Sequence, residues 1–242
     1  VEGPIGNQQV SPRSLVILLV SLIIGLCIPA FVLWLRYMLD VAIHGRKDVE
    51  NATTIPVLGE VPRMKNANNN KSLITDLSSD DPVVEAFRII RFSLGYMRHS
   101  TQVMMTTSTT PGQGKSFVAR NMAAILAMAG KRVLVVDGDI RKRTLSESFG
   151  HTFGLTTYLS DDHTQVADLL PSGPTPPNPT ELLMSDRLHQ LMQQLRQMYD
   201  HIIIDSTPMF SVADASIVNR ESDITIFVLR AGVQNRDFLP DF

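Results

Sequence analysis

Four continuously apolar runs that alternate with helix-forming segments constrain the fold of this chain more than any other feature. Helical spacing of apolar residues marks the segments between the runs, at 115–130, 180–199 and 213–222. Strands that are apolar along their whole length and separated by helices predict a doubly wound, mostly parallel α/β sheet with both faces covered. Such a sheet binds ligands at the carboxyl ends of its strands. The four runs are QVMMTTS (102–108), RVLVVDGD (132–139), HIIIDS (201–206) and DITIFVLRAG (223–232).

The loop after the first run has the pattern of a phosphate-binding loop. Such loops read G-x-x-x-x-G-K-[ST], and TTPGQGKS matches except at Thr109, which occupies the first glycine position. Gly112 and Gly114 permit positive φ, so the following amides can turn toward an anion at a positive helix end. An ordinary strand–turn–helix connection is the structural alternative. The candidate nucleotide-binding residues are Thr110, Pro111, Gly112, Gln113, Gly114, Lys115, Ser116 and Phe117.

Three acidic residues follow two further apolar runs. Asp137 and Asp139 end the run VLVVDGD, and Asp205 ends HIIID. A single acid in such a place is commonly a helix cap. Three acids and a phosphate loop at one sheet edge instead predict phosphoryl transfer, which needs a metal shell for the phosphate charge and a carboxylate that accepts a proton.

A long uncharged run near the beginning of the chain predicts a transmembrane helix. SLVILLVSLIIGLCIPAFVLWL (14–35) would span about 33 Å as a helix, enough for a bilayer. Basic residues are more frequent after the run than before it, which places the rest of the chain in the cytoplasm. The expected domains are an extracytoplasmic stub (1–13), a transmembrane helix (14–36), a juxtamembrane segment with a linker (37–80) and a P-loop domain (81–242).

Composition excludes several other classes of protein. The formal net charge of −2 over 242 residues gives no electrostatic reason to expect nucleic acid as a partner. The single cysteine, Cys27, excludes an intramolecular disulfide, and its place in the apolar run argues against a metal-ligand role.

A helix that begins at Asp81-Pro82 precedes the first strand. Its apolar residues recur at helical spacing, and a neighbouring stripe carries Glu85, Arg88 and Arg91. A solvated face with ion pairs three residues apart explains such a stripe without any partner.

Together, TSTTPGQGKS, VLVVDGDIR and IIIDSTP resemble the Walker A, Walker A′ and Walker B motifs of the bacterial tyrosine kinases. Their kinase domains are the cytoplasmic parts of inner-membrane proteins that govern polysaccharide polymerisation and export. The resemblance implies an autokinase that uses ATP and Mg²⁺, acts on its own copies and has a cognate tyrosine phosphatase. It assigns phosphate binding to Lys115 and Ser116, metal binding to Ser116, Asp139 and Asp205, catalysis to Asp137, Lys115 and Asp139, and ring assembly to Glu85, Arg88 and Arg91.

The chain departs from that family in lacking a tyrosine cluster at its end, so we expect a partial chain or acceptor tyrosines on another chain. The division of roles between Asp137 and Asp139 stays open. Two alternatives also remain. A MinD/ParA-like positioning ATPase shares the sheet but carries an early loop lysine where this chain has Thr110. A non-catalytic chain-length scaffold would use its nucleotide only to set its oligomeric state.

Overall fold

The computed structural model describes residues 14–63, 80–97, 101–139, 168–172, 179–209, 213–236 and 239. It contains two compact units, Val1–Ala42 and Ile43–Phe242. The expected stub (1–13), residues 64–79 of the expected juxtamembrane segment and linker, and all residues from 140 to 167 lie outside the described residues.

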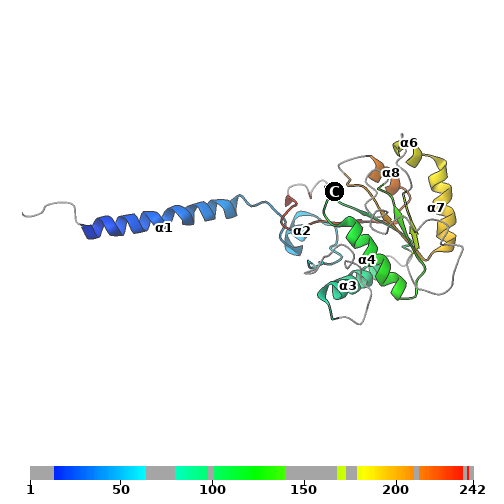
Figure 1. Ribbon diagram of the computed structural model, residues 1–242, viewed down its shortest axis with the longest axis horizontal. Helices are drawn as coiled ribbons and strands as arrows, with labels where there is room; N and C mark the ends of the chain where they lie inside the picture. The colour runs from blue at the N-terminus through cyan, green and yellow to red at the C-terminus, as the bar shows by residue number, and fades with distance from the viewer. Residues whose placement is uncertain are drawn as a thin grey trace, which may run out of the picture. The chain divides into compact units, whose positions relative to one another are not determined.

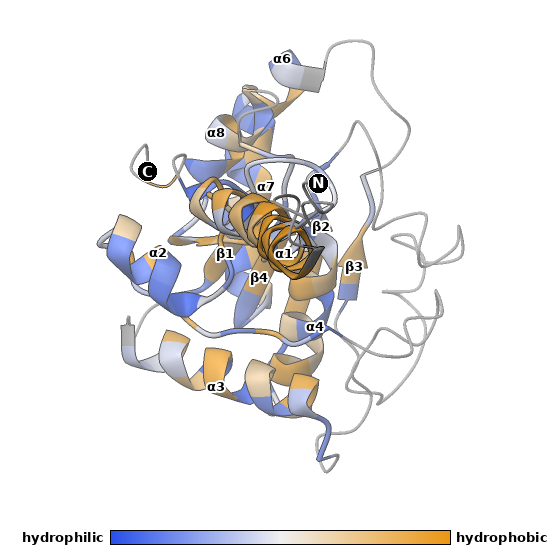
Figure 2. Ribbon diagram, turned by 90° about the vertical axis from the view of Figure 1, so that its left-hand side faces the viewer, coloured by the Kyte–Doolittle hydropathy of each residue, from blue (hydrophilic) through white to orange (hydrophobic). Residues whose placement is uncertain are grey.

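The described part of the first unit is mainly one apolar helix, α1 (Ser14–Met38). Its large hydrophobic side chains are exposed along the whole helix, and none of Leu15–Met38 is buried by other parts of the protein. Figure 2 shows the same helix as almost uniformly hydrophobic. By length and composition, α1 is therefore suited to cross a membrane, in agreement with the sequence. The helix ends at Met38, and the juxtamembrane segment contains a further short helix, α2 (Arg46–Ala52).

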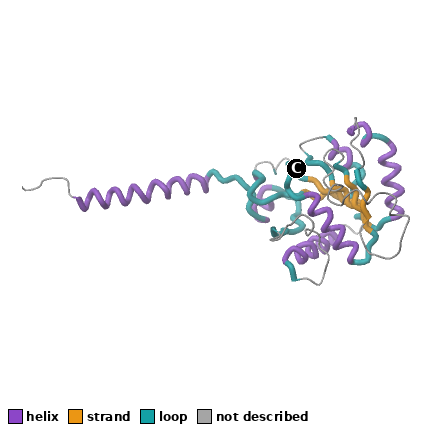
Figure 3. The backbone as a smooth tube through the Cα atoms, in the orientation of Figure 1, coloured by secondary structure: helices purple, strands orange, loops and turns teal. Residues whose placement is uncertain are grey.

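The second unit is built on a five-stranded sheet in which every pairing is parallel. The strand order β3-β2-β4-β1-β5 differs from the order along the chain, as in a doubly wound fold. Figure 3 shows the strands in the middle of this unit with helices on both sides. The strands are β1 (Val103–Thr107), β2 (Val133–Asp137), β3 (Asp168–Leu170), β4 (His201–Asp205) and β5 (Ile224–Phe227).

Helices α3 (Pro82–Met97) and α4 (Lys115–Met128) cover one face of the sheet (Figure 1). Alternate strand residues such as Met104, Val135 and Ile203 pack against them in one hydrophobic cluster. Asp81 caps α3, because its Oδ1 accepts a hydrogen bond from the Val83 amide at 2.8 Å. This confirms the helix start that the sequence predicted.

The opposite face is covered by α6 (Pro179–Leu183), α7 (Asp186–Met198) and α8 (Asp214–Asn219). Met105, Ile202 and Ile204 point to this side and form a second cluster with residues of α7 and α8. The sequence predicted one helix over 180–199. The structure has a turn at Met184 and Ser185, where Ser185 Oγ donates to the Leu182 carbonyl and so satisfies a helix-end acceptor.

The segment before α3 belongs to the second unit rather than to a separate linker. Ile43 is buried, and Leu58 and Val61 pack on the α3–α4 side of the core. The run IPVLGEVP (55–62) forms neither a helix nor a strand of the sheet. The compact unit thus begins at Ile43, whereas the sequence analysis begins the P-loop domain at residue 81.

Candidate nucleotide-binding and catalytic site

The loop between β1 and α4 has the backbone that a phosphate cradle needs. Gly112 and Gly114 have φ angles of 82° and 100°, a region that favours glycine. Gly114 is the N-cap of α4, and Lys115 is the first residue of that helix. The amides at this end of α4 therefore present a positive helix terminus to the loop. No packing neighbour lies within 4 Å of a Cβ placed on either glycine, so the glycines serve the backbone conformation rather than a close contact.

Lys115 and Ser116 are placed beside the strand that ends in Asp205. Lys115 is 8% exposed. The Ser116 hydroxyl donates a hydrogen bond to Asp205 Oδ2 at 2.5 Å. Thr106 on β1 donates from Oγ1 to Asp205 Oδ1 at 3.4 Å, so the carboxylate is held from both sides. A serine hydroxyl and a buried carboxylate thus meet at the base of the loop.

The strand register brings the other acids to the same place. Asp137 and Asp205 are direct partners at the ends of β2 and β4, and both are almost fully buried. Burial, with smaller contributions from the charges of Asp137 and Asp139, raises the pKa of the Asp205 carboxyl to about 6 against the lowering effects of Ser116 and Lys115. Three carboxylates share one poorly solvated edge, an arrangement typical of functional sites.

Gly138 allows this close approach of β2 to β4. A Cβ at this position would lie 3.0 Å from Ile204 Cγ2 and 3.1 Å from the Asp205 carbonyl oxygen. The Gly138 amide donates to that same carbonyl at 2.9 Å. A side chain at this position would have to push the end of β4 back by a few tenths of an ångström, so glycine favours the close approach of Asp137 and Asp139 to Asp205.

Unsatisfied hydroxyls lie directly after β4. Among the described residues, Ser206 Oγ and Thr207 Oγ1 are buried without hydrogen-bond partners. Buried groups of this kind are normally satisfied by a ligand or by ordered water. Within the residues that the structure describes, no group of three His, Cys, Asp or Glu side chains is arranged to hold a metal ion by itself. Mg²⁺ does not need one, because it is usually held by one or two carboxylates together with substrate phosphates and water.

Not every candidate side chain points into the loop. Phe117 packs into the hydrophobic cluster, with its ring 6.0 Å from that of Phe87 on α3. Gln113 turns inward, and its Nε2 donates to the hydroxyls of Thr109 and Thr110 at 2.7 Å each. At Phe117 and Gln113, therefore, the backbone and not the side chain is available to a phosphate.

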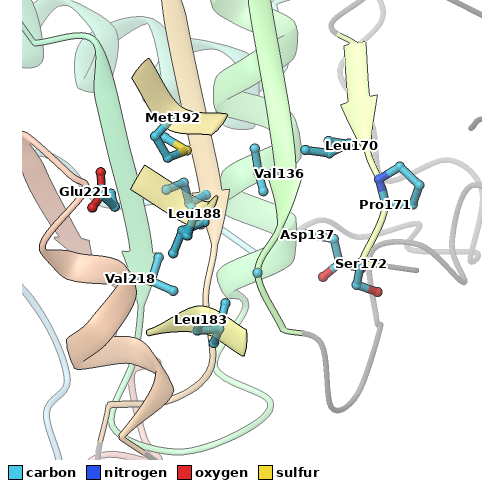
Figure 4. A pocket seen from close by; sticks show the side chains of 12 residues that line it. Val136, Asp137, Leu170, Pro171, Ser172, Leu183, Leu188, Met192, Val218 and Glu221 are labelled. Carbon is cyan, nitrogen blue, oxygen red and sulfur yellow. The ribbon is translucent and has the colours of Figure 1, made fainter. Parts of the chain in front are cut away.

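An apolar pocket lies beside the acids on the α7 face of the sheet. Figure 4 shows Leu188 and Met192 of α7 and Val218 of α8 lining it together with Val136. Asp137 and Ser172 lie at one end of the pocket. The site therefore has a polar side, formed by the loop, and an apolar side.

The charged stripe of α3 lies away from this edge and has partners within the chain. Glu85 and Arg88 form an ion pair at 2.6 Å, with 57% and 35% of their side chains exposed. Arg91 Nη1 donates to the Ile125 carbonyl of α4 at 3.5 Å. The Glu85–Arg88 contact is an ion pair between neighbouring turns of one helix, and both side chains remain partly exposed to solvent.

Comparison with known proteins places this geometry in a family. The model of the CobQ/CobB/MinD/ParA nucleotide-binding domain matches residues 104–221, which include the loop and all three acids. The solved BceF tyrosine kinase domain is 33% identical, with a TM-score of 0.67, over 83% of this chain and 91% of its own. The chain belongs to the bacterial tyrosine kinase family. The kinase domain of Escherichia coli tyrosine kinase ETK agrees, with 30% identity, a TM-score of 0.66 and coverage of 81% and 86%.

Curated bacterial tyrosine kinases match almost the whole chain. Tyrosine-protein kinase etk of Escherichia coli is 31% identical over 93% of this chain, and tyrosine-protein kinase wzc of Salmonella typhimurium is 32% identical over 92%. Tyrosine-protein kinase ptk of Acinetobacter johnsonii is 30% identical over 92%. The chain spans about a third of the length of these relatives, between 34% and 36%.

The structure also reveals site residues that the sequence analysis missed. Thr106 contacts Asp205, and its only sequence signal is a polar residue inside a buried strand. Arg120 donates from Nε to the Ser116 carbonyl at 3.2 Å. Burial lowers the pKa of the Arg120 guanidinium, and the nearby Asp205 charge partly opposes this. Gln234, which contacts Thr109, comes from a segment that has no motif at all.

Proposed function

We propose that this chain is the nucleotide-dependent kinase part of a membrane-anchored protein-tyrosine autokinase. The observation that carries the proposal is the meeting of Lys115 and Ser116 with three buried carboxylates at one sheet edge. Relatives named tyrosine-protein kinase supply the reaction class, transfer of a phosphoryl group from ATP to tyrosine.

Each polar group of the edge has a role in this proposal. The amides from Gly112 to Ser116 and the Lys115 ammonium bind the nucleotide phosphates. Ser116, Asp205 and Asp139 hold Mg²⁺, directly or through water, and the ion neutralises phosphate charge. The buried hydroxyls of Ser206 and Thr207 and the Ser116–Asp205 contact fit such a ligand.

Asp137 is proposed as the group that accepts the proton of the tyrosine hydroxyl. It adjoins the apolar pocket, whose walls suit an aromatic side chain better than a phosphate. Asp139, two residues beyond the end of β2, is then left to the metal side of the site.

The cellular setting is part of the same proposal. We place the kinase unit on the cytoplasmic face of a bacterial inner membrane, with α1 as its anchor. Its substrates are tyrosines of other copies of this protein, assembled as a ring through Glu85, Arg88 and Arg91. Its partners in this proposal are a tyrosine phosphatase and the polysaccharide export machinery, as the resemblance to the bacterial tyrosine kinases implies.

Labelled ATP tests the reaction directly. Purified full-length protein in detergent should form phosphotyrosine, and both Lys115→Met and Asp137→Asn should reduce it by at least about a hundredfold, as expected for groups that act in the transition state. Lys131→Met and Asp186→Asn are matched controls, because both residues are exposed and lie outside the site. These controls should retain full activity.

Other outcomes would favour the alternatives. Phosphate release without phosphotyrosine would indicate a positioning ATPase of the MinD/ParA type. ATP-dependent assembly without either product would indicate a scaffold. Undiminished phosphotyrosine in Lys115→Met would exclude this loop as the catalytic site.

A further inference from the structure

Thr109, the first residue of the phosphate loop, is hydrogen-bonded to the side chain of Gln234, which is distant in sequence. Thr109 donates from Oγ1 to Gln234 Oε1, and Gln113 Nε2 donates to the same oxygen at 2.8 Å. Gln113 Nε2 also donates to Thr109 Oγ1 at 2.7 Å. The exposed fractions of Thr109, Gln113 and Gln234 are 2%, 5% and 5%, so water does not compete for these bonds. Gln234 Oε1 is thus the shared acceptor for two buried donors of the loop.

Gln234 is itself fixed by backbone contacts outside the loop. Its carbonyl accepts a hydrogen bond from the Ile43 amide at 2.9 Å, and the Ile43 carbonyl accepts one from Gly232 at 2.8 Å. From the same segment, Arg230 Nη1 donates to the Gly112 carbonyl at 3.2 Å. The segment 230–234 therefore touches the loop at Thr109, Gly112 and Gln113 while it is anchored at Ile43.

Apolar packing does little to define the shape of the loop, in which Ser108 Oγ also donates to the Thr110 carbonyl at 2.8 Å. Gly112 and Gly114 have no side chains, and even an added Cβ would have no neighbour within 4 Å. Side-chain hydrogen bonds, rather than packing, must therefore hold the loop in the conformation that turns its amides toward a phosphate. Thr109 provides a hydroxyl for this purpose, which the usual glycine at that position lacks.

We propose that Gln234 is a positioning residue of the nucleotide site: it fixes the phosphate loop through Thr109 and Gln113 and thereby sets nucleotide affinity. The proposal rests on the proposed function only in that this loop binds a nucleotide. Thr109 and Gln234 then form a functional pair. The threonine that replaces the usual glycine is the residue through which the segment 230–234 binds the loop.

The test is the affinity of Gln234→Leu for a fluorescent ATP analogue with Mg²⁺, measured on the full chain in detergent. Leucine has a similar size but no acceptor, so the buried Thr109 hydroxyl loses its partner, while the Gln113 amide keeps its contacts with the Thr109 and Thr110 hydroxyls. We expect the dissociation constant to rise about tenfold. The rate at saturating nucleotide should change less, because Gln234 does not contact the reacting groups. Thr109→Ala combined with Gln234→Leu should bind more tightly than the product of the two single effects predicts.

Gln102→Leu is the matched control for a purely structural effect. Gln102 Nε2 donates to the carbonyls of Arg196 and Tyr199 at 2.6 and 2.7 Å, just before β1 and therefore at the opposite edge of the sheet. This variant should lower the urea midpoint of unfolding as Gln234→Leu does but leave the nucleotide dissociation constant unchanged.

Three results would count against this inference, each in a different way. Normal affinity in Gln234→Leu, with normal binding by the unsubstituted chain, would overturn the positioning role alone. Failure of the unsubstituted chain to bind nucleotide would overturn the proposed function together with this inference. Equal losses of affinity in Gln102→Leu and Gln234→Leu would reduce the role of Gln234 to general stability.

Discussion

Asp205 is a carboxylate in a poorly hydrated environment. It lies at the end of β4, almost fully buried, opposite Asp137 and in contact with the Ser116 hydroxyl. Burial raises its pKa from the usual 3.8 to about 6. In the absence of a cation, the ionised form therefore costs folding free energy, which a bound metal ion would offset.

This gives a pH-dependent prediction for Asp205→Asn. Between pH 4 and 6 the folded state retains a proton that the unfolded chain has lost, so stability decreases as pH rises through that window. A difference of about two pKa units corresponds to roughly 3 kcal/mol. Without nucleotide or Mg²⁺, Asp205→Asn should therefore be more stable than the unsubstituted chain at pH 7, by up to that amount, and nearly equal to it at pH 4.

Urea unfolding at pH 4, 5, 6 and 7 measures the difference. Asp186→Asn, an exposed carboxyl in the first turn of α7, serves as the control and should not reproduce the pH dependence. Parallel pH profiles for Asp205→Asn and the unsubstituted chain would show that burial does not raise the pKa of Asp205.

At the scale of elements, α3 combines a buried face with a charged stripe. Val84, Phe87 and Ile90 pack on α4, as their spacing predicted, whereas the Glu85–Arg88 pair is partly exposed. An exposed ion pair three residues apart contributes only a few tenths of a kcal/mol to the helix. The stripe is therefore available for an intersubunit contact at little cost to the fold.

Charge reversal tests that contact. Arg88→Glu combined with Arg91→Glu should reduce the particle size of the detergent-solubilised protein, because like charges would then meet acids of a neighbouring copy. Size-exclusion chromatography with light scattering measures the mass. Arg46→Glu breaks a comparable exposed pair with Glu50, at 2.6 Å on α2, and should leave the mass unchanged. An unchanged mass in the double variant would remove the reason to regard α3 as an assembly helix.

At the scale of the whole molecule, the second unit includes the segment that precedes α3. Ile43 is 3% exposed, Leu58 and Val61 pack on the core, and a Cβ on Gly59 would lie 2.7 Å from Ile90 Cγ1. The segment also fixes Gln234 through the Ile43 backbone. The boundary of the folded unit is therefore set by packing and not by the linker that the sequence displays.

A shortened chain tests this boundary. Residues 81–242 should be less stable than residues 43–242 by about 3 kcal/mol or more, since three apolar side chains and their contacts are removed. Urea unfolding of the two chains measures the difference. Equal midpoints would mean that the segment 43–63 contributes nothing to the fold.

Much of the fold and of the site follows from local pattern. The apolar runs predicted β1, β2, β4 and β5, and the Asp81 cap predicted the start of α3, because side-chain periodicity and capping act within a few residues. The strand β3 was missed: it is three residues long, and its exposed first residue gives no apolar run. The break between α6 and α7 was missed because neither glycine nor proline marks it.

The sequence by itself determined the parallel sheet, the glycines and lysine of the loop, and the acids that end the strands, since each is encoded by neighbours along the chain. Only the tertiary structure decided that Asp137 pairs with Asp205 in register and that Gly138 leaves space for this approach. It also decided that Gln234 contacts Thr109, which lies 125 positions earlier in the sequence. These contacts depend on strand order and chain crossover, which no local pattern carries, because residues distant in sequence meet only when the whole core is packed.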